Sequence, residues 1–330
     1  MKKRILTGIT TTGTPHIGNY LGAIKPALKL ATENDESYFF LADYHAIIKN
    51  TDKIEVNDSV KSVAISWLAS GLDVDKSFFY RQSDVPEILE LSWILSCVTA
   101  KGLMNRSHAY KAAVSANDNT DEDKGITMGL FSYPILMSAD ILMFNATHVP
   151  VGADQLQHIE MTRDIAGRFN HLYKIIFNLP EAIVGDENKT IPGIDGRKMS
   201  KSYKNVVPLL SDEKTLKKSI MKIVTNSLEP GEKKDSNDCT VFSLYSAFAS
   251  QDEISSLQEK YNDGIGWGDA KNLLFSKINE EIEPIREKYN ELQGKPDIIN
   301  DLLNEGAKKV RPQAKELIGQ IRDLIGISKV

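Results

Sequence analysis

The chain has 330 residues, 41% of them hydrophobic and 26% charged, and its formal net charge is −5. These values are typical of a globular protein with two domains, or with one large domain and an extension, and they exclude an overall basic surface for nucleic acid. The two cysteines, Cys97 and Cys239, lie far apart and have no Cys/His metal spacing, so we expect no disulfide framework, zinc site or iron–sulfur cluster. No apolar run approaches the roughly 20 residues of a membrane helix, and no signal-peptide core follows Met1, so we expect a cytoplasmic protein without a membrane.

Strand patterns alternate with helix patterns through the first half of the chain. The strand-like runs cover residues 4–9, 37–44, 77–81 and 147–151. The helical patterns cover residues 17–28, 52–70, 131–144 and 154–169. This alternation predicts an α/β fold, with a parallel sheet between two layers of helices and ligands bound at the carboxyl ends of the strands.

The pattern is helical from about residue 211 onward. Ser211-Asp212-Glu213 opens one helix, and the apolar residues between 274 and 292 form a single helical face. Two further helices are expected, one after Pro296 and one over residues 314–324. The chain is therefore expected to end in a small α-helical domain, whereas the polar and acidic residues 115–125 predict a surface loop.

Two short motifs carry most of the chemical information. The first motif, His16-Ile17-Gly18-Asn19, follows a strand and a Thr/Gly turn and opens a helix. At a helix start, unpaired backbone N–H groups and the helix dipole favour an anion. The second motif, Lys198-Met199-Ser200-Lys201-Ser202, lies in a loop with Gly193 and Gly196, and its ammonium and hydroxyl groups suit phosphate oxygens.

Either motif alone is more often a plain helix start or a solvated loop. Together, and in this order on a strand–helix pattern, they resemble the nucleotide-binding motifs of class I aminoacyl-tRNA synthetases. Four longer segments, at residues 18–23, 43–46, 133–140 and 149–160, resemble the bacterial tryptophanyl-tRNA synthetases.

The resemblance implies a Rossmann-type catalytic domain over residues 1–205 and a tRNA anticodon-binding domain over residues 206–330. It implies that the chain activates L-tryptophan with ATP, as its Mg²⁺ complex, and transfers it to tRNA(Trp). It also implies a homodimer. A tightly bound cofactor or a protein metal site is not expected.

Residue roles follow from the same resemblance. The catalytic residues would be His16, Asn19, Lys198 and Lys201. The ATP-binding residues would be Thr10, Thr11, Thr12, Gly18, Asn19, Lys111, Gly152, Ala153, Asp154, Ile191, Lys198, Met199, Ser200, Lys201 and Ser202. The tryptophan-binding residues would be Asp140, Met137, Tyr133, Gln155, His45, Val149, Val151 and Leu6.

Chemistry supports the assignment of Asp140. Indole carries one N–H donor on a large apolar body, which suits a buried acceptor among aliphatic and sulfur side chains. Taken alone, Asp140 could equally be a structural cap or an ion-pair partner, and His45 a buried, hydrogen-bonded histidine.

Three positions depart from the family pattern. Thr10-Thr11-Thr12-Gly13 stands where a Gln-Pro-Ser/Thr-Gly turn is common, so contacts made by that glutamine cannot be assumed. Ala153 stands where an acidic residue is common, and Ala113 where a second lysine often follows Lys111.

Two alternative functions stay open at this point. Tyrosyl-tRNA synthetases share both motifs, but they usually place a glutamine where Met137 stands, and a thioether is a poor partner for a phenol. A synthetase-like protein that binds ATP or RNA without catalysis is the other alternative, and the intact motifs argue against it.

Overall fold

The computed structural model describes residues 3–33, 36–117, 121–184, 191–237 and 239–327. Its described part contains a five-stranded parallel sheet with the strand order β3-β2-β1-β4-β5. The strands are β1 (Arg4–Thr10), β2 (Glu36–Ala42), β3 (Phe78–Arg81), β4 (His148–Pro150) and β5 (Glu181–Ile183). The Rossmann-type sheet predicted from the sequence is therefore confirmed.

The strand order reverses beside β1. Connections from β1 run first to β2 and β3 on one side, and the chain then returns to place β4 on the other side of β1. In open parallel sheets such a reversal leaves a crevice at the carboxyl ends of the strands. β5 was not predicted, because its three residues Glu181–Ile183 are too few to produce a recognisable strand pattern.

Most helices of the first half join successive strands. They are α1 (Ile17–Asn19), the π-helical turn η1 (Tyr20–Ile24), α2 (Lys25–Thr32), α3 (Asp43–Ala46), α4 (Lys53–Ala69), η2 (Gln82–Asp84), α5 (Glu87–Val98), α6 (Lys101–Met104), α7 (His108–Ser115), α8 (Met128–Met143), η3 (Ala153–Gln155) and α9 (Leu156–Leu172). Asp52 caps α4 and Thr127 caps α8 with side-chain oxygens, as expected at helix starts. Part of the predicted acidic loop at 115–125 lies outside the described residues.

The remaining part of the chain is helical, as predicted. It contains η4 (Lys201–Tyr203), α10 (Glu213–Met221), α11 (Thr240–Ser246), α12 (Gln251–Asn262), α13 (Trp267–Gln293) and α14 (Pro296–Ile325). The prediction of two separate helices after Pro296 is wrong, because α14 is one helix of 30 residues. Pro312 lies inside it; proline lacks the N–H group that continues a helix, so it suggests a break in the sequence.

Alternate residues of the central strands face two separate cores. On β2, Tyr38 and Phe40 face a core shared with α5, α8, α9 and α14, whereas Phe39 and Leu41 face a core shared with α1, α2, α4 and α10–α13. Each of these four side chains is at most 7% exposed. Helices therefore cover both faces of the sheet, as the strand–helix alternation predicted.

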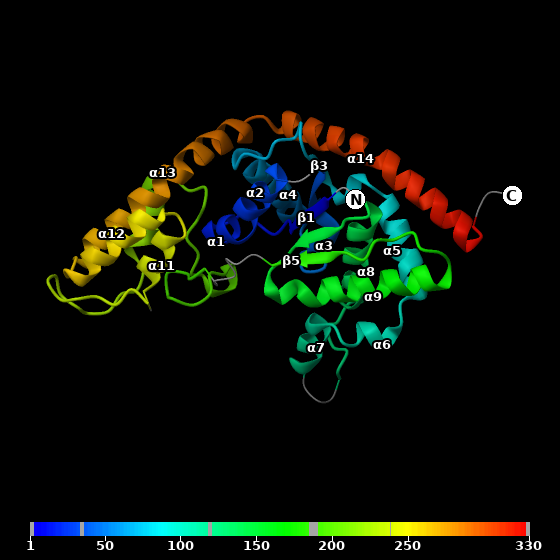
Figure 1. Ribbon diagram of the computed structural model, residues 1–330, viewed down its shortest axis with the longest axis horizontal. Helices are drawn as coiled ribbons and strands as arrows, with labels where there is room; N and C mark the ends of the chain where they lie inside the picture. Colours follow the sequence, from blue (N-terminus) through cyan, green and yellow to red (C-terminus); the bar gives the residue numbers. More distant parts are fainter. Residues whose placement is uncertain (1–2, 34–35, 118–120, 185–190, 238, 328–330) are drawn as a thin grey trace.

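The last two long helices form an arch across one side of the molecule (Figure 1). α13 packs on α4, α10 and α11, and α14 then crosses β3 and α5. Gly306 permits this crossing: a Cβ atom there would lie 1.7 Å from the carbonyl oxygen of Phe79. The arch is thus anchored to the sheet where α14 crosses β3.

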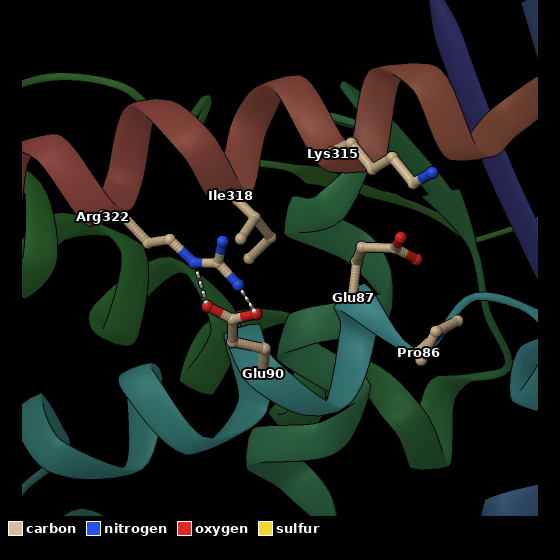
Figure 2. Close-up of a pocket in the computed structure, with 6 residues that line it drawn as sticks. All are labelled: Pro86, Glu87, Glu90, Lys315, Ile318 and Arg322. Carbon is tan, nitrogen blue, oxygen red and sulfur yellow. Dashed lines mark hydrogen bonds and ion pairs between the residues drawn. The ribbon is translucent and has the colours of Figure 1, made fainter. Parts of the chain in front are cut away.

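Charged side chains join α14 to α5. Arg322 contacts Glu90 at 2.6 Å, and Arg311 contacts Glu87 at 2.9 Å. Figure 2 shows the open groove beside these pairs, which is lined by Pro86, Glu87, Glu90, Lys315, Ile318 and Arg322. In the described residues, no helix combines the length and the apolar character that a membrane span needs.

Candidate active site

The two motifs meet at the carboxyl end of β1. The Lys201 ammonium donates a hydrogen bond to the carbonyl oxygen of Thr12 at 2.6 Å. The backbone N–H of Gly18 contacts the sulfur of Met199 at 3.3 Å. Residues that are 181 positions apart in the chain are therefore in direct contact, at the crevice where parallel sheets bind ligands.

His16 begins helix α1 and is held there by Asn19. The backbone N–H of His16 donates to Oδ1 of Asn19 at 3.0 Å, and the backbone N–H of Asn19 donates to the carbonyl oxygen of His16 at 2.9 Å. The imidazole is 8% exposed, and within the described residues its Nδ1 has no hydrogen-bond partner. Burial first, and then the nearby Lys201 charge, lower the pKa of His16 to about 4. The imidazole is therefore neutral at pH 7.

Gly18 makes room for this imidazole. A Cβ atom at Gly18 would lie 3.0 Å from the His16 ring and 3.3 Å from the Met199 sulfur. A side chain here would push against both motifs, so the glycine allows them to approach each other.

Asn205 shapes the loop that carries the second motif. Its Nδ2 donates to the carbonyl oxygen of Lys198 at 3.0 Å and to Asp195 at 2.7 Å, and its Oδ1 accepts from the backbone N–H of Ser200 at 2.8 Å. A Cβ atom at Gly193 would lie 2.4 Å from the Asn205 side chain. Gly193 thus provides space for the Asn205 side chain.

The remaining residues of the loop differ in exposure. Met199 is buried, and its backbone N–H donates to the carbonyl oxygen of Ile191 at 2.9 Å. Lys198, Lys201 and Ser202 are exposed. Lys201 lies against the Thr10–Thr12 turn, and desolvation lowers its pKa. The second motif therefore presents two exposed lysines, of which Lys201 is anchored by a hydrogen bond to Thr12.

Asp140 is completely buried and its carboxylate has two side-chain partners. His45 Nε2 lies 2.9 Å from Oδ2, and Gln82 Nε2 donates to both oxygens, at 2.7 and 3.0 Å. Burial raises the pKa of Asp140, and the hydrogen bonds from His45 and Gln82 act in the opposite direction. His45, for which the sequence left two readings open, is thus joined directly to Asp140.

Four polar side chains form a chain of hydrogen bonds from α8 to the turn before α9. Tyr133 Oη lies 2.7 Å from His158 Nε2, and His158 Nδ1 lies 2.7 Å from Oε1 of Gln155. Gln155 in turn donates to Asp154 at 2.8 Å. This chain places the hydroxyl of Tyr133 and the amide of Gln155 in one connected network.

Apolar residues predicted to line the tryptophan pocket lie on one face of the sheet. Leu6 and Val149 are buried in the core beneath α8 and α9, and Met137 and Val151 pack against the same core. Asp140 lies on α8, which contributes Ile135, Ala139 and Ile141 to the same core.

Other predicted residues lie beside these two groups or apart from them. Thr10 and Thr12 are exposed at the end of β1, and Thr11 is buried. Gly152 precedes η3, and a Cβ atom there would lie 2.7 Å from the Asp154 carboxylate, which leaves little space for a side chain. Lys111 is exposed on α7, and within the described residues no side-chain hydrogen bond or ion pair joins it to either motif.

Three residues of this arrangement were missed in the sequence: Gln82, His158 and Asn205. Gln82 follows the last residue of β3 directly, so the rule that ligand-binding residues follow strand ends could have found it. His158 lies in a segment that carries the family resemblance, but nothing in its spacing indicated a contact with Tyr133. Asn205 acts through backbone groups of its own loop, which leave no sequence pattern.

The arrangement has two chemically distinct halves. One combines a helix start, a neutral imidazole and a lysine, which suits phosphate oxygens. The other combines a buried carboxylate with apolar walls, which suits a large apolar ligand that has one hydrogen-bond donor. In the described residues, no group of three or more His, Cys, Asp or Glu side chains could hold a metal ion.

Comparisons with known proteins agree with this arrangement. The family model "tRNA synthetases class I (W and Y)" matches residues 1–283. The tryptophan–tRNA ligase of Neisseria meningitidis is 54% identical over 99% of this chain and 98% of its own length. The ligase of the same name from Pseudomonas aeruginosa is 53% identical over 99% of this chain and 74% of its own length.

Solved structures give the same result. The tryptophanyl-tRNA synthetase of Campylobacter jejuni, complexed with ADP and tryptophan, has a TM-score of 0.88 and 42% identity, covering 98% of this chain and 99% of that one. A tyrosyl-tRNA synthetase from Archaeoglobus fulgidus, at 17% identity and a TM-score of 0.67, shares the fold alone. The chain therefore belongs to the class I tRNA synthetases of the tryptophan and tyrosine type.

Proposed function

We propose that this chain activates L-tryptophan with ATP to tryptophanyl-adenylate and transfers the tryptophanyl group to tRNA(Trp). The observation that carries this proposal is the completely buried carboxylate of Asp140, which lies on a helix that packs into the same core as Leu6 and Val149. Relatives that are 51–54% identical over nearly the whole chain bear the name tryptophan–tRNA ligase, which supports it.

Activation is an in-line attack of the tryptophan carboxylate on the α-phosphorus of ATP. A new P–O bond forms to the carboxylate oxygen as the bond to pyrophosphate breaks, so the protein must position the reactants and stabilise charge. His16 and Asn19 contact the phosphates from the start of α1, and Lys201 and Lys198 follow the departing pyrophosphate. ATP enters as its Mg²⁺ complex, and the cation stays on the phosphates.

Asp140 recognises the indole N–H. A carboxylate offers about four lone-pair positions, and the bonds from His45 and Gln82 leave capacity for one more donor. A ligand without that donor would leave the buried carboxylate incompletely paired, which is costly. Tyrosine has a hydroxyl instead, and Met137 gives that hydroxyl no strong partner.

We also propose a division of labour along the chain. Residues 1–205 bind ATP and tryptophan, and residues 206–330 bind the tRNA anticodon, in the reduced environment of the cytoplasm. The two parts are joined beside the active site, since the backbone N–H of Ile17 donates to the carbonyl oxygen of Val207 at 3.0 Å. Binding of tRNA by the helices can thus reach the first motif through direct contacts.

We further propose that two copies of the chain form a homodimer through α5. Leu89, Trp93 and Cys97 recur every four residues on this helix, so they share one face. Trp93 is 71% exposed and Leu89 is 41% exposed. A large aromatic side chain at this exposure, with apolar neighbours, is typical of a protein–protein contact.

The proposed activity is tested by ATP–pyrophosphate exchange with each of the twenty amino acids in turn. We expect exchange that depends on tryptophan alone. Exchange that depends on tyrosine would overturn the assignment of Asp140 and Met137. Absence of exchange from folded protein that still binds ATP would favour a synthetase-like protein without catalytic activity.

A further inference from the structure

One carboxylate of the helical part contacts the active-site helix at two points. Glu281, on α13, accepts a hydrogen bond from Tyr20 Oη at 2.7 Å. The same carboxylate accepts from Lys25 Nζ at 2.7 and 3.0 Å. Tyr20 is only 5% exposed, and the Glu281 side chain is 28% exposed, so this contact is partly shielded from water.

Tyr20 and Lys25 lie at the two ends of the π-helical turn. η1 begins at Tyr20, and the backbone N–H of Lys25 donates to the carbonyl oxygen of Tyr20, five residues earlier. In a regular α-helix, residues five apart point about 140° away from each other around the axis, because each residue turns by about 100°. The wider π-turn places the two side chains on one face, so a single carboxylate can contact both.

An aromatic ring supports the same contact. The Phe248 ring packs against that of Tyr20, with centroids 6.5 Å apart, and Lys25 Nζ lies 5.6 Å from the Phe248 ring centre. Phe248 follows α11, which itself packs on α13. The π-turn is therefore held by two separate elements of the helical part, which lie beside α1 and α2 in Figure 1.

We propose that Glu281 is a positioning residue for amino-acid activation, because it holds the π-turn and thereby fixes the direction of the first motif. This inference rests on the proposed function. Asn19 directly precedes the π-turn, and its Oδ1 holds the backbone of His16. Conversion of the π-turn to a regular α-helix would rotate His16 and Asn19 by about 100° relative to α2, away from the phosphates.

The inference gives Glu281 a role beyond a surface ion pair. Because α13 also packs on α10 and α11, any shift of the helical part moves the Glu281 carboxylate relative to Tyr20 and Lys25. Occupancy of the helical part by tRNA would then reach the first motif through Glu281 as well as through the Ile17–Val207 bond.

The test compares Glu281→Ala with Glu291→Ala. Glu291 is a matched control on the same helix, since it pairs with Lys288 at 3.0 Å and Lys295 at 2.9 Å on the surface. For Glu281→Ala we expect kcat of tryptophan-dependent ATP–pyrophosphate exchange to fall about 10-fold or more. The reason is that misplaced catalytic groups stabilise the transition state less well. Tryptophan affinity, measured by calorimetry without ATP, stays within about twofold of the parent, whereas the control changes neither quantity.

A second variant and a structure separate positioning from general damage. Tyr20→Phe keeps the contact with Phe248 and removes the hydrogen bond, so adding it to Glu281→Ala should cause no further loss. In crystals of Glu281→Ala, we expect the Lys25 N–H to bond to the carbonyl oxygen of Leu21, which is the α-helical register.

Three results would overturn the inference. They are an unchanged kcat in Glu281→Ala, a loss of tryptophan affinity as large as the loss in kcat, and a π-turn that persists in the crystal. Failure of the proposed function is recognised separately, because the parent chain would then show no tryptophan-dependent exchange. In that case, the hydrogen bond of the Lys25 N–H in crystals of Glu281→Ala still tests whether Glu281 holds the π-turn.

Discussion

His16 combines three properties that follow from its place at the start of α1. Its backbone is held by Asn19, its ring is buried beside Gly18, and its pKa lies near 4 because of burial and the nearby Lys201. A neutral imidazole donates one hydrogen bond and adds no charge, so Lys198 and Lys201 must supply the positive charge for the phosphates. The residues of the first motif were predictable from the sequence. That His16 is neutral while the lysines carry the charge depends on the burial of His16, which the sequence does not show.

The lowered pKa of His16 predicts a pH-dependent contribution to stability. In the unfolded chain histidine binds a proton near pH 6.5, whereas folded His16 binds it only near pH 4. Protons therefore favour unfolding: the contribution of His16 is complete above pH 6.5 and is lost as the pH falls toward 4. Between pH 7 and pH 5 this loss amounts to about 2 kcal/mol.

Urea unfolding of the parent chain and of His16→Gln measures this effect. Glutamine keeps a polar side chain at this position but does not titrate, so the parent should lose about 2 kcal/mol relative to the variant between pH 7 and pH 5. A difference in unfolding free energy that stays constant with pH would show that His16 titrates normally.

The surroundings of Asp140 contain both residues that were predicted from the sequence and one that was missed. The resemblance identified the carboxylate and its apolar neighbours, and the structure gathers them on one face of the sheet. Gln82, which donates to both carboxylate oxygens, was missed because a contact between residues 58 positions apart depends on how β3 lies relative to α8. A partner of this kind is set by the tertiary fold.

At the scale of elements, long periodic segments were predicted well and short or interrupted ones were not. β1, β2 and α13 have clear patterns, and the apolar face of α13 continues past Pro284, whereas β5 has only three residues and α14 was divided near Pro312. The π-turn at Tyr20–Ile24 was also missed, since the apolar spacing of residues 17–28 fits an ordinary helix. Its position depends on contacts with α13, which local sequence does not encode.

The loop of the second motif is an element built around Asn205. Asn205→Ala removes three hydrogen bonds that fix the backbone at Lys198 and Ser200, together with the Asp195 side chain. Loss of such buried bonds costs about 1–3 kcal/mol, so we expect a fall of about 10- to 100-fold in kcat of pyrophosphate exchange. Tryptophan affinity without ATP should not change, because the loop is separate from the Asp140 pocket.

Asn178→Ala provides the control for this experiment. The Asn178 side chain also donates a hydrogen bond to a backbone carbonyl, that of Asn145, and Asn178 is not among the predicted site residues. Equal losses of activity in the two variants would argue that Asn205 contributes only to folding. A selective loss in Asn205→Ala supports its role in placing the second motif.

At the scale of the whole molecule, the helical part and the sheet form one connected structure. α14 returns to the sheet and buries Ala307, Val310 and Ala314 in the same core as Leu6 and Tyr38. The packing is therefore shared across the proposed boundary at residue 205.

The exposed face of α5 predicts the oligomeric state. Trp93→Asp would place a charge in the centre of the proposed dimer contact, and burying an unpaired charge is costly, so we expect monomers. Ile54→Asp is the matched control, since Ile54 is 72% exposed on α4. Sedimentation velocity distinguishes the outcomes: a dimer that survives Trp93→Asp unchanged would place the interface elsewhere.

The central claim is that the Asp140 carboxylate selects tryptophan through its indole N–H. The most direct measurement is kcat/KM of pyrophosphate exchange with tryptophan and with the analogue that has sulfur in place of that N–H. Sites built to bind a donor reject ligands without it strongly, so we expect the parent chain to prefer tryptophan by about 100-fold or more. Asp140→Ala should reduce this preference to less than about 10-fold. Equal kcat/KM values for the two amino acids in the parent chain would contradict the account.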